Sequence, residues 1–179
     1  MNETQKAILG RYSCRDFTGE PLTQAQLDAL VEAALSAPSA MNSQPWKIIM
    51  VTDKALIEKM DAAGMAALQR DDQTAYQRMM DRGGRLLYNA PCMVLVLGNN
   101  AMDNGILTQN VALSAHAMGL GNVICGLAGV PLNGAQKDEF RKALNWPEGY
   151  NFGMAVLVGN AKSDNAPHAL DFGKVSWVK

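Results

Sequence analysis

The sequence has few of the residues that most often build metal sites and disulfide frameworks. It contains two histidines, His116 and His168, and three cysteines, Cys14, Cys92 and Cys125, without CxxC spacing. Two histidines cannot form a His-rich metal site, and an odd number of cysteines favours reduced thiols over a disulfide framework. We therefore expect no metal, and we interpret the chain as a cytoplasmic protein.

An excess of charge of one sign and long apolar runs are lacking as well. The formal net charge is -1, from 16 Lys and Arg against 17 Asp and Glu. Such a balance gives no positive field to attract nucleic acid or an anionic membrane. No apolar run approaches the roughly 20 residues of a spanning helix, and the first residues show no signal-peptide pattern. We expect a soluble protein with neither nucleic acid nor membrane as partner.

The common catalytic motifs are absent too. The segment from Gly119 to Ile124 breaks the GxGxxG pattern at its last position, and there is no Walker loop or GxSxG elbow. His116 falls inside a predicted helix, and we interpret it as a structural residue. A protein with so few candidate acids, bases and nucleophiles can still be an enzyme if a bound cofactor carries its reaction.

What the sequence does contain is enough apolar material for one core, since 48% of its 179 residues are hydrophobic. The patterns predict one α+β domain over 1–179, with a mixed or mostly antiparallel sheet flanked by helices. We expect interrupted helices over 53–88, with breaks at Gly64 and at Gly83-Gly84. The tail over 171–179 carries Trp177 and should not float freely. The remaining predicted helices cover about 23–37, 104–118 and 134–144, and the predicted strands cover 46–51, 93–98, 121–125 and 154–159.

Two arginines alternate with a serine in the segment Arg11-Tyr12-Ser13-Cys14-Arg15. On an extended backbone these three side chains project to one side and can converge on a phosphate monoester. Alternatively, the two arginines cap the C-terminal end of the first helix, where its dipole favours positive charge. The spacing alone does not decide between these two interpretations.

A second cluster runs from Ala37 to Lys47 and places small and amide residues between a helix and a core strand. This arrangement can offer hydrogen bonds to a flat polar ring. An ordinary polar connection is the alternative interpretation.

These two clusters are where the sequence resembles the nitroreductase family of flavoproteins. The motif Arg-x-Ser-x-Arg-x-Phe occupies Arg11 to Phe17, and the more specific block runs from Pro38-Ser39 through Asn42 to Trp46. The likeness continues in the same order through 88–91 and 109–121. The resemblance implies a nitroreductase-like fold and an intertwined homodimer with FMN bound at the subunit interface.

The family's roles can be carried onto matching positions. The resemblance implies that Arg11 and Ser13, with Tyr12 between them, hold the phosphate and ribityl chain, while Arg15 lies at the N1 and C2 carbonyl edge of the flavin. The backbone near Cys125 and Gly126 would donate toward N5. Lys174 would be the C-terminal cation at the phosphate, although its surroundings depart from the Pro-Arg-rich pattern of the family. The residues expected to come from the partner subunit are Pro38, Ser39, Ala40 and Asn42.

The implied activity is that of an FMN-dependent oxidoreductase. It would pass hydride from NAD(P)H through flavin N5 to a nitroaromatic or quinone acceptor by a ping-pong mechanism. Arg15 would tune the flavin without itself reacting. A specialised flavin dehydrogenase or reductase with another substrate, or a non-catalytic flavin-binding protein, are the alternatives. Arg82 or Arg85 could supply a further contact to the flavin or to a nicotinamide cofactor, but we interpret both as a solvated helix face.

Overall fold

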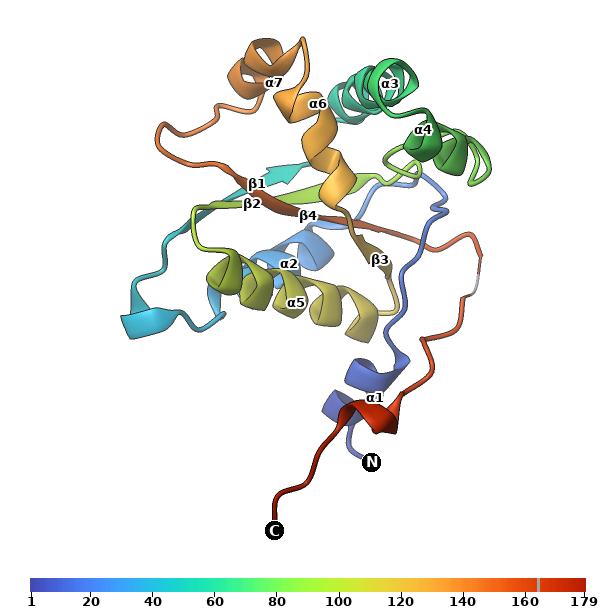
Figure 1. Cartoon of the computed structure of the whole chain (residues 1–179). Coiled ribbons are helices and arrows are strands. Elements are labelled where there is room, and N and C mark those ends of the chain that lie inside the picture. Colours follow the sequence, from blue (N-terminus) through green and yellow to red (C-terminus); the bar gives the residue numbers. More distant parts are fainter. Residues whose placement is uncertain (164) are drawn as a thin grey trace.

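The computed structural model describes residues 1–163 and 165–179 and is built around an antiparallel sheet (Figure 1). Its strands lie in the order β1-β2-β4-β3, and every described pair is antiparallel. The central strand β2 is buried along its whole length, as expected for a strand covered on both faces. The expected α+β fold with a mostly antiparallel sheet is thus confirmed. The strands are β1 (Trp46–Val51), β2 (Cys92–Gly98), β3 (Gly121–Ile124) and β4 (Phe152–Gly159).

Helices cover both faces of this sheet (Figure 1). Helices α2 (Gln24–Leu35) and α5 (Ala101–Ala117) lie on one face and pack against each other. The other face carries α3 (Lys54–Asp71), α4 (Gln73–Met80), α6 (Gly129–Asn133) and α7 (Lys137–Ala143). One apolar cluster fills each face. Helix α1 (Glu3–Gly10) stands apart from these layers and contacts α5.

Local side chains set the helix boundaries. Thr23 and Gln26 form a reciprocal capping box at the start of α2. The side chain of Asn100 caps α5, which therefore begins three residues earlier than the apolar spacing indicated. Helix α2 ends at Leu35, shortly before the predicted stop.

The expected break at Gly64 is wrong, because α3 continues through this residue. A Cβ at Gly64 would collide with Leu86 and press on Pro131. The glycine therefore serves close packing and does not end the helix. The break at 83–84 is real, with φ of 99° at Gly83 and 69° at Gly84. Helix α6 was not predicted, and α7 begins later than position 134.

The C-terminal tail does not pack as expected. The side chain of Trp177 is 82% exposed and that of Val178 is 100% exposed. Figure 1 shows this end running away from the sheet, after the short helix η3 (Phe172–Lys174). Within one chain, the prediction that Trp177 anchors the tail is wrong. In the part of the chain that the structure describes, no helix has the length and apolar character needed to cross a membrane.

Candidate functional site

The predicted phosphate-binding segment lines a cavity of about 300 Å³, here called the strip cavity. Arg11, Ser13 and Arg15 all face it, while Cys14 points the other way and is fully buried. The alternation read from the sequence is therefore present in three dimensions. Tyr12 and three residues of the C-terminal region complete the lining, namely Asn165, Ala166 and His168.

The backbone of this segment is fixed to the edge of the sheet. The amide N–H of Cys14 donates to the carbonyl of Asn122 in β3, at 2.8 Å. Gly121 allows this approach, because a Cβ there would lie 2.9 Å from the Cys14 sulfur. The strip cavity thus sits beside an edge strand, on a rigid support.

His116 anchors the start of the same segment from α5. Its ring packs edge-on against Tyr12, with ring centroids 6.2 Å apart, and lies against Gly10, where a Cβ would come within 3.0 Å of Nε2. Burial, with a smaller contribution from the positive charge of Arg11, lowers the pKa of His116. These contacts support the interpretation of His116 as a structural residue.

The helix-capping alternative for the arginines holds only for the backbone of Arg11. Its amide N–H donates to the carbonyl of Ala7 at the end of α1. Arg15 lies further along, and its Nη1 is 3.5 Å from the carbonyl of Ser13. In the described residues neither guanidinium forms an ion pair with a carboxylate within 4 Å. Both cations remain available to an anion.

Cys125 and Gly126 lie at the end of β3, close enough to Arg15 for its charge to act on the Cys125 thiol. The amide N–H of Cys125 is already bonded to the Ala155 carbonyl at 2.8 Å, so it is not a free donor. Gly126 is exposed and opens the short helix η2 (Gly126–Ala128), a position whose N–H has no partner inside the helix. Of the two backbone donors expected here, only that of Gly126 is open.

Burial also affects the three cysteines. It raises the pKa of Cys92 to about 12 and raises the pKa of Cys14 and of Cys125. A thiol with a raised pKa carries little thiolate, the nucleophilic form, near neutral pH. Among the described residues, no three His, Cys, Asp or Glu side chains gather closely enough to hold a metal ion.

The segment with Pro38, Ser39, Ala40 and Asn42 lies elsewhere, between α2 and β1, and does not line the strip cavity. Figure 1 shows its short helix η1 (Ala40–Asn42) beyond the N-terminal end of α5, whereas β3 lies near the other end of that helix. The backbone is unusual here, with φ of 54° at Met41 and 52° at Asn42. Such values are uncommon outside glycine and indicate a tightly specified turn.

A buried carboxylate holds this turn in place. Asp103, in the first turn of α5, accepts a hydrogen bond from the amide N–H of Ala40 at 3.3 Å. Next to the turn, the Ser39 hydroxyl accepts a hydrogen bond from the backbone N–H of Gln44 at 2.9 Å. The η1 turn is therefore presented at the surface by α5 of its own chain.

Lys174 is likewise separate from the strip cavity. Its Nζ lies 4.0 Å from the carboxylate of Asp171, and the side chain is exposed. Within a single chain, the structure thus brings Arg11, Tyr12, Ser13 and Arg15 together at the strip cavity. Cys125 is close enough to Arg15 to feel its charge, but Cys125, Gly126, the η1 turn and Lys174 do not line that cavity.

A second cavity, which we call the basic cavity, was not foreseen from the sequence. It has a volume of about 570 Å³, and Arg15, Arg82, Arg85 and Lys162 all line it. Arg82 and Arg85 were interpreted as a solvated helix face, but they follow α4 in the connection to β2 and face this hollow. The sequence positions of Arg82 and Arg85 do not indicate this cavity, because only the fold brings them close to Arg15.

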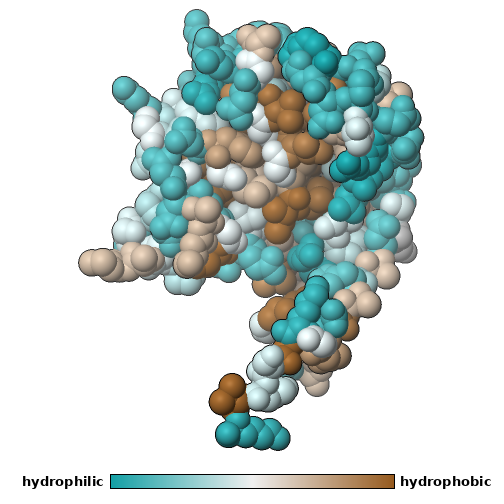
Figure 2. Space-filling model, in the orientation of Figure 1, coloured by the Kyte–Doolittle hydropathy of each residue, from teal (hydrophilic) through white to brown (hydrophobic). Residues whose placement is uncertain are grey.

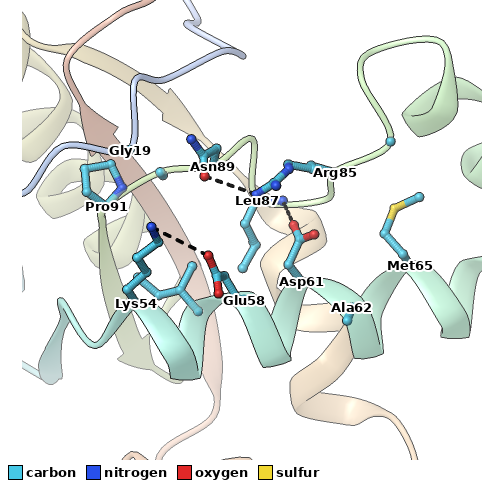
Figure 3. Close-up of a pocket in the computed structure, with 13 residues that line it drawn as sticks. Gly19, Lys54, Glu58, Asp61, Ala62, Met65, Arg85, Leu87, Asn89 and Pro91 are labelled. Atoms are coloured by element: carbon cyan, nitrogen blue, oxygen red, sulfur yellow. Dashed lines mark hydrogen bonds and ion pairs between the residues drawn. The ribbon is translucent and has the colours of Figure 1, made fainter.

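A third cavity, of about 480 Å³, lies between α3 and the segment 84–91 (Figure 3). Asp61 rises from α3 and accepts the amide N–H of Leu87 at 2.5 Å. Burial raises the pKa of Asp61, against the opposing effect of backbone donors and Arg85. Asp61 therefore ties the segment that carries Arg85 and Asn89 to α3.

The same segment is also tied to the residues that follow Arg15. The side-chain amide of Asn89 donates to the backbone carbonyl of Phe17 at 3.2 Å. The backbone N–H of Phe17 donates to the carbonyl of Tyr88 at 3.3 Å. Arg85 is oriented by a 3.1 Å hydrogen bond from its Nη1 to the side chain of Asn89. The wall between the basic cavity and the α3 cavity is thus held from both sides.

Taken together, the fold and the strip cavity define an α+β protein with two arginines and a serine gathered at one cavity beside its outermost strand. More specifically, the chain belongs to the nitroreductase family, whose model matches residues 8–160. The resemblance read from the motifs is therefore confirmed.

Individual relatives agree with this assignment. A crystal structure of a nitroreductase with bound FMN from Desulfitobacterium hafniense DCB-2 is 45% identical, with a TM-score of 0.96 and coverage of 100% of both chains. A nitroreductase from Bacteroides fragilis NCTC 9343 is 21% identical, covers 100% of both chains with a TM-score of 0.88, and shows the fold alone. An NADPH-flavin oxidoreductase of Vibrio harveyi is 33% identical over 168 residues, covering 89% of this chain. The chain spans 64% of that relative's length.

Proposed function

We propose that this chain is an FMN-dependent oxidoreductase that takes hydride from NAD(P)H and passes it to an oxidised acceptor, a nitroaromatic or a quinone. The observation that carries the proposal is the strip cavity, where Arg11, Ser13 and Arg15 converge and where no carboxylate among the described residues pairs with either arginine. The FMN bound to the Desulfitobacterium relative, which is 45% identical over the whole chain, supports the identity of the ligand.

The residues present fit a phosphate monoester. Two guanidinium groups and one hydroxyl supply charge-assisted hydrogen bonds, which are stronger than neutral ones. The rigid attachment of Cys14 to β3 holds these groups in place before the ligand arrives, which lowers the entropic cost of binding. Arg11 and Ser13 would hold the phosphate and ribityl chain.

Arg15 would lie at the ring. It lines both the strip cavity and the basic cavity, and its charge reaches the Cys125 thiol at the end of β3. Arg15 would therefore lie between the bound phosphate and the edge of the sheet. FMN supplies hydride transfer at its ring when bound. A fixed cation near N1 stabilises negative charge there, and the exposed Gly126 would offer its N–H toward N5.

The chain also needs a partner to complete the site, and we propose a second copy in an intertwined homodimer. The η1 turn does not reach the strip cavity of its own chain, yet it presents Met41, which is 99% exposed. Further exposed apolar side chains lie on α1 and along the tail, and Figure 2 shows apolar atoms on the segment projecting from the body. Large exposed apolar surfaces of this kind mark association sites.

The direct test is spectroscopic. Purified protein should show the visible band of an oxidised flavin, and that band should bleach when NADH or NADPH is added without oxygen. It should return on addition of a nitroaromatic or quinone, with parallel double-reciprocal plots as expected for a ping-pong mechanism. A colourless protein that takes up no FMN, or bound flavin that neither nucleotide bleaches, would contradict the proposal.

A further inference from the structure

The strip cavity and the basic cavity lie on either side of Arg15, which is the one residue that lines both among those the structure describes. FMN carries one phosphate, and the strip cavity offers it Arg11, Ser13 and the adjacent backbone. The cations of the basic cavity are thus left over once the cofactor's phosphate is placed.

These cations are also unpaired. Among the described residues, Arg82, Arg85 and Lys162 form no ion pair within 4 Å. The acidic residue that lines the basic cavity with them is Asp16. Asp61 acts on Arg85 from the other side of the segment, within the α3 cavity. The described lining of the basic cavity therefore carries a local surplus of positive charge, in a chain whose formal net charge is -1.

The cations come from three parts of the chain that the fold brings together. Arg15 follows the strip, Arg82 and Arg85 lie between α4 and β2, and Lys162 follows β4. Arg85 is held by Asn89, whose amide is in turn bonded to Phe17. Like charges gathered in a hollow repel one another, and an anion relieves that repulsion. The arrangement is that of a binding site and not of a scattered charged surface.

We propose that the basic cavity binds an anionic group, a carboxylate or a phosphate, of a substrate that reacts at the flavin. This inference rests on the proposed function, because Arg15 places the cavity next to the ring. An anionic group held there would orient the rest of the substrate toward the cofactor. The anion comes from one of two sources, the 2′-phosphate of NADPH or a carboxylate on the acceptor.

The test compares the FMN-loaded wild type with the double variant Arg82→Gln, Lys162→Gln. Both side chains are exposed and make no described contact that folding needs, and the two glutamines remove charge while keeping polar length. Arg78→Gln is the matched control, because Arg78 is an exposed cation on α4 outside the cavity. Thermal midpoints of all three proteins verify folding.

Binding is measured by calorimetry with two probe pairs. Adenosine 2′,5′-bisphosphate against AMP reports the nucleotide source, and 4-nitrobenzoate against 4-nitrobenzamide reports the acceptor source. We expect the double variant to bind the more anionic compound of one pair roughly tenfold more weakly, because charge-assisted hydrogen bonds are lost. Its affinity for the less anionic compound of that pair should not change. The same preference should shrink in the wild type at about 0.5 M salt, where screening acts over a few ångströms.

Steady-state kinetics give the second readout. The ratio of kcat/KM for NADPH over NADH, or for nitrobenzoate over nitrobenzamide, should fall by the same factor, while the control keeps the wild-type ratios. Unchanged ratios and affinities in both pairs would overturn the proposal. It is also overturned if the double variant binds FMN more weakly, because the cations would then belong to the cofactor site. Failure of the proposed function looks different, because then no nucleotide bleaches the flavin in the wild type.

Discussion

At the scale of single residues, two arginines of one sequence motif stand in different surroundings. Arg11 follows the last residue of α1 and lines the strip cavity but not the basic cavity. Arg15 lines both cavities, and its positive charge lowers the pKa of the Cys125 thiol against the larger effect of burial. The same side chain type is therefore expected to do two jobs, one at the phosphate and one at the redox ring.

This division predicts different outcomes for Arg11→Ala and Arg15→Ala. We expect Arg11→Ala to weaken FMN binding by roughly tenfold or more, since it removes charge-assisted hydrogen bonds to the phosphate. Arg15→Ala should retain most FMN but show a lower flavin midpoint potential and slower reduction. Flavin fluorescence titration and anaerobic reduction measure the two effects. Equal loss of FMN in both variants would contradict the division.

The buried thiols predict an unreactive native protein. Cys14 and Cys92 are fully buried, Cys125 nearly so, and burial raises the pKa of each. A disulfide reagent such as DTNB should therefore modify native protein slowly at neutral pH and modify all three thiols once the chain is unfolded. Rapid release of one equivalent of thionitrobenzoate from the native protein would show that one of these three thiols becomes accessible in the folded state.

Asp61 predicts a pH-dependent effect on stability. Because its pKa is raised in the folded protein, its contribution to stability is greatest below the pKa of the unfolded chain and is lost as pH rises through the raised value. Asp61→Asn keeps an oxygen for the Leu87 amide but carries no charge. We expect this variant to melt at a higher temperature than the wild type at neutral pH, with the difference vanishing near about pH 4. A less stable variant at neutral pH would mean that attraction to Arg85 outweighs burial.

At the scale of elements, the sequence was sufficient for most strands and helices and insufficient where packing overrides propensity. The β-branched run of β1 and the capping box of α2 are local signals, so both were predicted close to their observed bounds. Gly64 was misread as a break because the reason for a glycine there is Leu86, which is far along the chain. Arg82 is exposed as expected but lies in a turn after α4 and not on a helix, and its cavity could not be predicted because it is assembled from distant segments.

The role of Gly64 is testable with one methyl group. Gly64→Ala should destabilise the protein by about 1–3 kcal/mol, because the new Cβ would overlap Leu86. Gly105→Ala in α5 is the matched control, since the space around its Cβ position is open within 4 Å. Helix propensity alone would make that control more stable by about 0.5–1 kcal/mol. Denaturant unfolding measures both, and a stabilised Gly64→Ala protein would contradict the close-packing role of this glycine.

At the scale of the whole molecule, the surface of one chain is incompletely covered. Apolar residues of the tail are exposed, including Phe172 at 78%, and Met41 projects from the η1 turn. In a single chain these side chains contribute no free energy of burial, because their apolar surface stays in water. They would contribute it if another molecule covered them.

A tail deletion separates folding from assembly. Removing residues 170–179 takes away Leu170, Phe172, Val175, Trp177 and Val178, all of them exposed. We expect the remaining chain to fold but to dimerise more weakly, by at least about tenfold in Kd, because the apolar area buried in the dimer falls. Sedimentation equilibrium across a concentration series measures the change. A wild type that stays monomeric at high concentration would exclude the proposed homodimer.

The tether between Ala40 and Asp103 has a genetic consequence. If the η1 turn, held by α5 of one subunit, completes the cavity of the other, then each site draws on both copies of the gene. A strip variant that no longer retains FMN and an η1 variant that no longer completes the partner's cavity would each be inactive alone. Co-expressed, they would form mixed dimers in which one site inherits both intact halves, so about a quarter of all sites regain function in a two-fold symmetric assembly. Two defective alleles would complement each other within one protein.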